Sequence, residues 1–406
     1  MRSSRMQNIV NLNDPEFLKD RRSSYRDLRT NTPVAVTELD GEKALVLTRY
    51  QDVDKVTKSA ASIVQPEAGH FPSNIGDGPS ADFYRRSLPS IDHPLHSELR
   101  RIISPVFLPQ SIATMEQWVI EIVDRELDSI AQMPVVEVMS QLAHRIAVGV
   151  ICKVLHVPQE DGELLTSKVG DLVRIFSQGS LTKAILDKTD SAATELTNYF
   201  SALLERLPEL PLTDFMGALT AAERTGAIDR EECVALATDV LLGNYHTTVV
   251  SITNAVHAFA LFPQQHRILV ANPDLATRAW EEVLRFEAPV HFRLRYVSAP
   301  VSVGNFNVEP GVRLLLGFAS ANWDEEVFES PDSFIISRPP IRHFAFGSGR
   351  HFCLGAPLSR LEGRIILPRF LSRFPNYRPI DLAPARNEDL TFPCIERLFI
   401  EPGRSD

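Results

Sequence analysis

The sequence predicts a mainly α-helical protein with small β-sheets, folded as a single domain over residues 1–406. Apolar side chains recur at helical spacing along most of the chain, whereas strand-like alternation is confined to short stretches. Residues 229–262 contain no proline, and a helix of that length would span about 50 Å, enough to cross the molecule. No long polar stretch rich in glycine or proline divides the chain, so we expect one domain built around a long central helix.

The other elements are expected in the following order. Residues 14–28 have a helical pattern, and residues 34–47 contain two short strands around an Asp40-Gly41 turn. Residues 62–91 are rich in glycine and proline and are predicted to form a loop. Further helices are expected at 93–106, 110–132, 138–155, 160–177, 189–206 and 274–287, and further strands within 297–316 around a Glu309-Pro310-Gly311 turn.

Local signals mark the ends of two helices. Asp229 precedes Glu232 by three residues, which is the spacing of a capping box and marks the start of the central helix. Residues 355–371 carry apolar side chains at helical spacing, and Pro357 is tolerated in the first turn. Pro368 is expected to kink or shorten the far end of this second helix.

Charge and cysteine usage restrict the classes of partner. A net charge of -10 argues against nucleic acid or an anionic membrane as a partner. The N-terminal residues contain no apolar run long enough for a signal peptide or a membrane anchor. We therefore expect a cytoplasmic protein with no nucleic-acid and no membrane partner. A reducing compartment also fits the cysteines, which show no paired or CxxC spacing: Cys152, Cys233, Cys353 and Cys394.

Cys353 lies in the most informative segment of the chain. It belongs to the run Phe346-Gly347-Ser348-Gly349-Arg350-His351-Phe352-Cys353-Leu354-Gly355, a glycine-rich turn that leads into the helix at 355–371. The start of that helix would place partial positive charge beside the sulfur and lower the pKa of the thiol. Glycines can adopt positive φ and let the backbone approach a flat ligand closely. Gly347, Gly349 and Gly355 are expected to serve in this way.

The spacing of Phe, Gly, Gly, His, Cys and Gly in residues 346–355 resembles the haem-binding signature of the cytochrome P-450 family. Glu282 and Arg285, on one helix face, match the Glu-x-x-Arg pair that serves the scaffold of that family. The resemblance implies a cytochrome P-450 fold, a triangular haem domain, with haem b (iron protoporphyrin IX) as the cofactor. It also implies that the Cys353 thiolate is the axial iron ligand, with Phe346 and Gly347 beside the haem.

The two haem propionates require cations or hydrogen-bond donors, because burying carboxylates without partners is costly. His96 and Arg100 are four residues apart and share one side of an expected helix. The resemblance assigns this pair to the propionates, together with Arg295 and His351. Arg293 is the alternative to Arg295, and the spacing in the family favours Arg295.

The centre of the long helix departs from the pattern of the family. The resemblance implies the order small residue, glycine, any residue, acid, threonine, threonine. This chain has Gly243-Asn244-Tyr245-His246-Thr247-Thr248, so Asn244 replaces the glycine and His246 replaces the acid. Thr247 is expected to bond its own backbone four residues back and to open a groove for dioxygen. In the family, the threonine and the acid help to deliver protons. Because histidine titrates near neutrality, His246 is either a replacement proton relay or a buried core residue. Thr247 and His246 are therefore the candidate catalytic residues.

The substrate pocket is placed by the resemblance above the haem. Its walls would come from the long helix, the segment that follows Arg285 and the C-terminal hairpin. We expect a largely apolar ligand with several polar groups, bound in a pocket lined by Val240, Asn244, Val290, Phe292 and Phe392.

Electrons are expected from a ferredoxin and a ferredoxin reductase, as the resemblance to soluble bacterial members implies. Residues 347–352 lack the third glycine and the strand-to-helix context of a dinucleotide site, so the chain itself is not expected to bind the reductant. An acidic donor would dock on a basic patch near the cysteine, predicted from Arg100, Arg101, Arg350, Arg360 and Arg364.

These observations predict a cytochrome P-450 monooxygenase that hydroxylates a medium-sized organic molecule in specialised, or secondary, metabolism. The missing acid leaves oxidative coupling, cyclisation or desaturation without oxygen insertion as alternative reactions. A haem-thiolate sensor that binds a ligand without turnover is the alternative outside the enzymes. Substrate oxidation that depends on a redox partner would exclude the sensor, and product mass would separate the two reactions.

Overall fold

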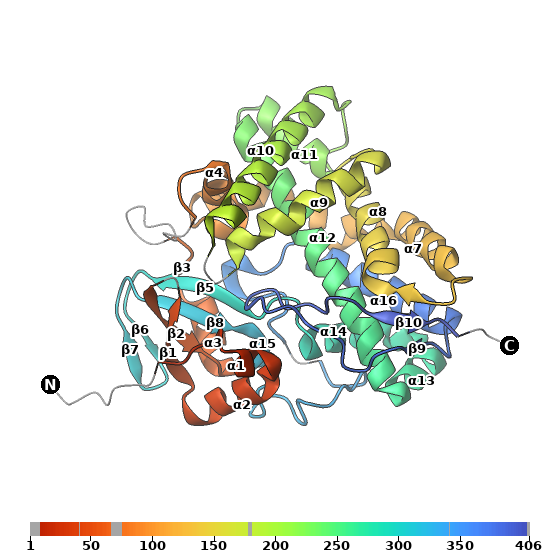
Figure 1. The fold of residues 1–406 in the computed structure, drawn as a ribbon. Coiled ribbons are helices and arrows are strands. Elements are labelled where there is room, and N and C mark those ends of the chain that lie inside the picture. Colours follow the sequence, from red (N-terminus) through yellow and green to blue (C-terminus); the bar gives the residue numbers. More distant parts are fainter. Residues whose placement is uncertain (1–8, 40, 66–74, 178–180, 341, 404–406) are drawn as a thin grey trace.

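Helices form most of the protein, and the sheets are small. The computed structural model describes residues 9–39, 41–65, 75–177, 181–340 and 342–403. The central helix α12 (Arg230–Leu261) runs diagonally through the molecule, with the largest sheet at the lower left of Figure 1 and helices α9 to α11 above it. This arrangement confirms the predicted fold class.

The main sheet has five strands in the order β1-β2-β8-β5-β3. It contains β1 (Val34–Leu39), β2 (Glu42–Leu47), β3 (Ser62–Ile63), β5 (Phe292–Val297) and β8 (Arg313–Gly317). The hairpin of β1 and β2 is antiparallel, as predicted from its turn, of which Asp40 lies outside the described residues and Gly41 has a φ of 76°. The parallel pairing of β2 with β8 joins this hairpin to the later strands. The smaller sheets contain β4 (Val136–Glu137), β6 (Val301–Val303), β7 (Phe306–Val308), β9 (Arg378–Pro379) and β10 (Phe399–Glu401).

The remaining helices surround α12 and the sheet. They are α1 (Pro15–Lys19), α2 (Arg21–Asn31), α3 (Tyr50–Lys58), α4 (Pro79–Arg86), α5 (Leu95–Ile103), α6 (Pro109–Ala113), α7 (Glu116–Ile130), α8 (His144–Val154), α9 (Gly162–Leu172), α10 (Lys183–Arg206), α11 (Phe215–Arg224), α13 (Pro263–Ala271), α14 (Ala276–Phe286), α15 (Phe318–Asn322) and α16 (Ala356–Arg373). Short 3-10 helices include η2 (Leu88–Ser90) and η8 (Gly349–His351), and a π-helical turn, η4 (Met139–Ala143), precedes α8.

The central helix α12 begins where the capping box predicted. The side chain of Asp229 accepts a hydrogen bond from the backbone N–H of Glu232, and the side chain of Glu232 accepts one from the backbone N–H of Asp229. Most of its second half is buried, from Thr248 to Phe259. A helix that is apolar on nearly all sides needs neighbours on nearly all sides, which explains its central position.

Several predicted boundaries were wrong. The expected loop at 62–91 contains α4 and η2, while residues 66–74 lie outside the described part. The expected helix at 110–132 is divided into α6 and α7. Pro368 does not shorten α16, which continues to Arg373. Proline removes one backbone hydrogen bond, and the burial of Phe370 and Leu371 beyond it offsets that loss.

The Glu282–Arg285 pair is buried in the core. Arg285 Nε donates to Glu282 at 2.8 Å, with side-chain exposures of 1% and 3%. Arg285 also donates to the backbone carbonyls of Asn322, Pro331 and Ser333. The pair therefore ties α14 to the irregular chain that leads toward Cys353, the scaffold role expected from the resemblance.

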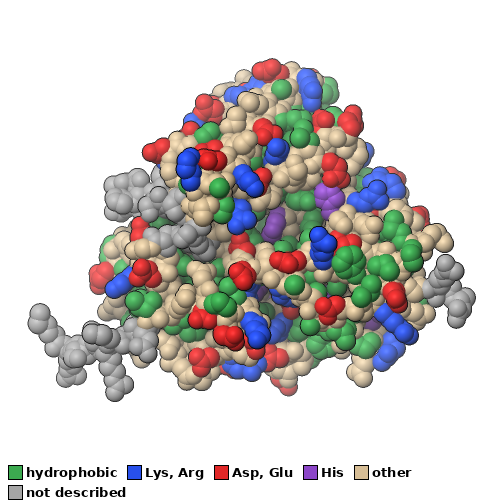
Figure 2. All heavy atoms as spheres, viewed as in Figure 1, with side chains coloured by type: hydrophobic (Ala, Val, Ile, Leu, Met, Phe, Trp, Pro, Cys, Tyr) green, Lys and Arg blue, Asp and Glu red, His purple; other side chains and the backbone are tan. Residues whose placement is uncertain are grey.

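The surface carries charges of both signs, interspersed over the face seen in Figure 2. Among the described residues, no helix is both long enough and apolar enough to cross a membrane.

Candidate functional site

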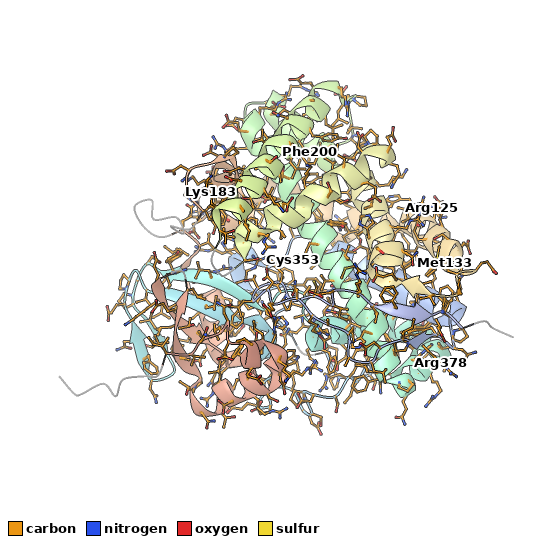
Figure 3. All side chains as sticks on the ribbon, in the orientation of Figure 1. Arg125, Met133, Lys183, Phe200, Cys353 and Arg378 are labelled. Carbon is orange, nitrogen blue, oxygen red and sulfur yellow. The ribbon has the colours of Figure 1, made fainter. Side chains whose placement is uncertain are left out.

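A cavity of about 320 Å³ lies between α12, β5 and the loop that carries Cys353. Cys353 lies near the centre of the molecule, beside α12 (Figure 3). The cavity brings together Cys353, the predicted cations, the middle of α12 and the beginning of β5. A volume of this size falls within the range of small-molecule sites, which is about 300–1,000 Å³.

The loop before Cys353 is shaped by two glycines. Gly347 and Gly349 have φ values of 64° and 69°, as predicted. A side chain at Gly349 would lie 2.1 Å from the backbone oxygen of Thr57, so only glycine fits there. The backbone N–H of Cys353 donates to the carbonyl of Phe346 at 2.8 Å, which closes the loop. Gly355 has a φ of -75° and caps α16, so the expectation of a positive φ was wrong for this residue.

Cys353 lines the cavity from inside the molecule, and its side chain keeps accessible surface there. Burial is the largest influence and raises the pKa of the Cys353 thiol, while the backbone N–H groups of Gly355 and Ala356 and the charge of Arg100 lower it. The prediction of a net lowering was therefore wrong for the protein alone. The donors at the start of α16 do stabilise the thiolate, but they do not outweigh its desolvation.

Four predicted propionate partners line the same cavity: His96, Arg100, Arg295 and His351. The rings of His96 and His351 lie 4.3 Å apart between centroids. Arg100 donates to the carbonyls of Arg350 at 2.9 Å and Phe352 at 2.6 Å, so it also supports the cysteine loop.

Positive charge is in excess around these four residues. Burial, followed by the charges of His351 and Arg100, lowers the pKa of His96 to about 4. Asp92 is the carboxylate whose charge reaches this cluster, and its Oδ1 lies 3.9 Å from Nε2 of His351. The two arginines outweigh Asp92 in charge, and both histidines can donate hydrogen bonds, so the cluster suits carboxylates such as those of a haem.

The middle of α12 forms the opposite wall. The hydroxyl of Thr247 donates to the carbonyl of Gly243 at 2.6 Å, which is the predicted bond to its own backbone. Asn244, Thr247 and Thr248 all line the cavity. The threonine that was predicted from its position in the helix therefore faces the cysteine loop.

His246 does not line the cavity. Its ring packs edge-on against Phe392, with centroids 5.5 Å apart, and its buried Nδ1 has no hydrogen-bond partner among the residues that the structure describes. Burial lowers the pKa of His246, which keeps the ring neutral. One residue along a helix is a rotation of about 100°, and this rotation separates His246 from the cavity-facing Thr247.

Glu362 is a buried carboxyl group that the sequence interpretation missed. It lies on α16 with no exposed surface, and the hydroxyl of Thr248 donates to it at 3.3 Å. Burial raises its pKa to about 8, while hydrogen bonds from Asn244 and Thr248 lower it only in part. The signal was an acid within the apolar stripe of the helix that follows Cys353.

The structure separates the five residues that were predicted for the substrate pocket. Val240, Asn244 and Val290 line the cavity, whereas Phe292 and Phe392 do not. Phe292 is fully buried on the opposite face of β5, in edge-to-face contact with Tyr25 at 5.6 Å. Successive side chains of a strand point to opposite faces, which turns Phe292 away when Arg293 faces the cavity.

Asp239 and Arg293 are two further charged residues of the cavity wall; Asp239 was not assigned to it from sequence, and Arg293 was named only as the alternative to Arg295. Asp239 accepts hydrogen bonds from the Ser87 hydroxyl and, at 2.6 Å, from the backbone N–H of Leu88. Burial raises the pKa of Asp239 to about 7. These bonds hold η2 against α12 and so define one wall of the cavity.

The predicted basic patch is smaller than expected. Arg360 pairs with Glu281 at 2.8 Å and Arg364 pairs with Glu116 at 3.0 Å, so their charges are largely compensated. Arg100 faces the cavity. Of the five predicted arginines, the exposed ones without an ion pair among the described residues are Arg101 and Arg350.

The chain resembles known proteins along most of its length. The sequence profile described as cytochrome P450 matches residues 5–379. The vitamin D(3) 25-hydroxylase of Pseudonocardia autotrophica is 31% identical, over 88% of this chain and 87% of that protein. The biotin biosynthesis cytochrome P450 of Bacillus subtilis (strain 168) is 28% identical, over 94% of this chain and 96% of that protein. A crystal structure of P450BioI in complex with acyl carrier protein ligated to hexadec-9Z-enoic acid has a TM-score of 0.88 at 27% identity, covering 96% of this chain and 100% of that one.

Proposed function

Because this chain belongs to the cytochrome P450 family, whose members are haem monooxygenases, we propose that it hydroxylates a medium-sized organic molecule in specialised metabolism. It would use dioxygen and two externally supplied electrons. The observation that carries this proposal is the convergence of the Cys353 sulfur, four cationic or potentially cationic side chains and the Thr247 side of α12 on one cavity. We also propose that residues 1–406 form one haem domain.

The cofactor of this proposal is haem b, whose iron would be held by the thiolate of Cys353. His96, Arg100, Arg295 and His351 would hold the two propionates, since these residues line the cavity as a cluster with excess positive charge. When bound, the haem supplies iron whose reactivity toward dioxygen is increased by the thiolate. The backbone of Phe346 accepts the N–H of Cys353 and keeps the ligand loop closed.

Protons for the reaction would come from the interior side of α12. Glu362 holds a proton at neutral pH, since its pKa is raised to about 8. Its neighbour Thr248 lines the cavity and could pass a proton through its hydroxyl. We therefore assign Glu362 the role that the resemblance gave to an acid at position 246. Thr247, bonded to Gly243, would orient the group that receives the proton.

Electrons would come from a ferredoxin with its reductase. Arg101 and Arg350 are exposed, and neither forms an ion pair among the described residues. Cations of this kind attract an acidic donor and increase its association rate at low ionic strength.

The central experiment uses the haem-loaded protein with a ferredoxin and its reductase. A compound library is screened for spectral shifts of the ferric haem, and the compounds that bind are then incubated with the redox partners and analysed by mass. Hydroxylation adds one oxygen atom to the product. Coupling, cyclisation or desaturation instead removes two hydrogen atoms. These reactions are the second candidate because position 246 holds a histidine where the family pattern has an acid.

Cys353→Ser provides the control, because it replaces the thiolate ligand while leaving the cavity shape nearly unchanged. The variant should lose the thiolate-type spectrum and all turnover. Ligand binding by the wild-type protein without any partner-dependent oxidation would overturn the enzyme proposal in favour of a sensor.

A further inference from the structure

Arg293 is a cation in the cavity wall for which the described part of the chain provides no counter-ion. It lies in β5, opposite Leu316 of β8, and faces the cavity together with Arg295. Among the described residues, no hydrogen bond or ion pair engages its guanidinium group. Other arginines of the interior are engaged: Arg285 binds Glu282, Arg313 binds Glu42, and Arg295 donates to the carbonyl of Leu294.

The carboxylates of the cavity do not neutralise Arg293. Asp239 lines the cavity, but both its oxygens already accept hydrogen bonds from the segment that leads into η2. Burial lowers the pKa of Arg293, and the ionisable groups that counteract this effect are Tyr84 and Cys353 rather than a carboxylate. A guanidinium group remains charged even so, and this one keeps accessible surface in the cavity wall. An anion that enters the cavity can therefore pair with it.

The side chain of Arg293 extends toward the wall formed by α12 and the C-terminal segment. Its guanidinium carbon lies 5.6 Å from the ring centroid of Phe392, and that ring packs against His246 of α12. Under the proposed function the haem propionates would have four partners in His96, Arg100, Arg295 and His351, which line the same cavity. Arg293 is therefore available to a second anionic ligand.

We propose that the substrate is an apolar carboxylic acid whose carboxylate pairs with the guanidinium of Arg293. This inference rests on the proposed function and names its class of substrate. Arginine binds carboxylates through two parallel hydrogen bonds, which fixes both position and orientation. The apolar body of the acid would lie against Leu88, Ile175, Val240 and Val290, which line the same cavity. The carboxylate would thus set which carbon of the chain reaches the iron.

The test compares acids with their uncharged esters on the haem-loaded protein. Linear acids of eight to sixteen carbons and their methyl esters are titrated while the ferric spectrum is recorded, and calorimetry gives the affinities of the compounds that bind. The wild-type protein should bind the best acid at least about tenfold more tightly than its ester. Arg293→Gln should weaken binding of the acid by about 10- to 100-fold and leave binding of the ester nearly unchanged. Arg293→Lys should retain part of the preference for the acid.

Arg378→Gln is the matched control, since Arg378 is exposed on β9 and lies far from Cys353 in Figure 3. This variant should keep the preference for the acid. Equal affinity of every acid and its ester in the wild-type protein would overturn the inference. If Arg293 instead served a propionate, Arg293→Gln would weaken acid and ester equally and speed haem transfer to apomyoglobin, which would also overturn it.

Turnover separates this inference from the proposed function. The tightest acid is incubated with the redox partners, and its oxidation is measured. Selective binding of acids without oxidation of any acid would contradict the monooxygenase proposal while supporting the anion site. If the protein instead bound acids and esters with equal affinity and oxidised both, the result would support the monooxygenase proposal and contradict the anion site.

Discussion

The hydroxyl of Thr248 donates a hydrogen bond to the buried carboxyl group of Glu362 at 3.3 Å, and this contact joins the central helix to the helix that follows Cys353. Thr248 lines the cavity and Glu362 does not. The carboxyl is buried and its pKa is raised to about 8. A proton can therefore be held just behind the cavity wall at neutral pH.

Glu362→Gln should uncouple the reaction. We expect product formed per reductant consumed to fall about tenfold or more, because the amide cannot donate and regain a proton as the acid does. Below pH 8 the wild-type carboxyl is protonated, so wild-type yield should decline as the pH rises through about 8. The variant should lack this decline. An unchanged yield and an unchanged pH profile would exclude Glu362 as the proton source.

His246→Gln should have little effect on the same measurement. His246 packs against Phe392 outside the cavity, and burial lowers its pKa so that the ring is neutral and not an imidazolium acid at pH 7. We expect the yield per reductant to stay within about twofold of the wild-type value, since a general acid or base contributes far more than this. A loss as large as that of Glu362→Gln would show that His246 is the relay.

Glu282→Ala should strongly destabilise the fold. It leaves the guanidinium group of Arg285, which is 1% exposed, without its carboxylate partner. Removing one member of a buried ion pair costs about 3–5 kcal/mol. Thermal and denaturant unfolding would measure this change. Asp187→Ala is the control, because the Lys183–Asp187 pair is exposed by 89% and 63% and should contribute less than about 1 kcal/mol. Similar losses in both variants would contradict the scaffold role of Glu282.

Arg350→Gln should slow reduction by an acidic ferredoxin, and the effect should be several-fold larger at low salt than at high salt. Stopped-flow reduction of the ferric protein would measure the rate. Arg378→Gln removes an exposed arginine that lies far from Cys353 in Figure 3, so it should leave the rate nearly unchanged. Equal slowing by Arg350→Gln at both salt concentrations would rule out electrostatic steering.

Asp239→Asn should alter the dependence of stability on pH. Burial raises the pKa of Asp239 from 3.8 to about 7, so the folded protein binds this proton more tightly than the unfolded chain. The resulting stabilisation is complete below the unfolded pKa and is lost as the pH rises through the folded pKa.

The free energy of unfolding should therefore decline between about pH 4 and pH 7, by up to about 1.4 kcal/mol per pH unit from this group. Asp239→Asn should show a shallower decline in denaturant titrations across this window. The exposed Asp187→Asn serves as the comparison and should follow the wild-type curve. A decline in Asp239→Asn that parallels the wild type would reject this assignment.

Much of the architecture followed from local patterns. Asp229 and Glu232 marked the start of the central helix because a capping box depends only on residues three apart. Gly347 and Gly349 indicated a loop with positive φ, and Thr247 was expected to bond to Gly243 within its own helix. Each of these signals lies within one turn or one helix. The helices α3, α11 and α13 were missed because their sequence signals for a helix start and end are weaker. Packing against the rest of the fold decides whether such segments are helical.

The sequence by itself pointed to the loop of Cys353 and to Thr247 as candidate site residues, together with His96, Arg100, Arg295 and His351. It could not determine which neighbours of these residues share the cavity. A rotation of one residue along α12 separates His246 from Thr247, and one step along β5 separates Phe292 from Arg293. Contacts between distant segments, such as that of Thr248 with Glu362, exist only after folding. Burial and charge compensation depend on these long-range contacts, so only the tertiary structure decided that the pKa of Glu362 is raised and that Arg293 has no ion pair among the described residues.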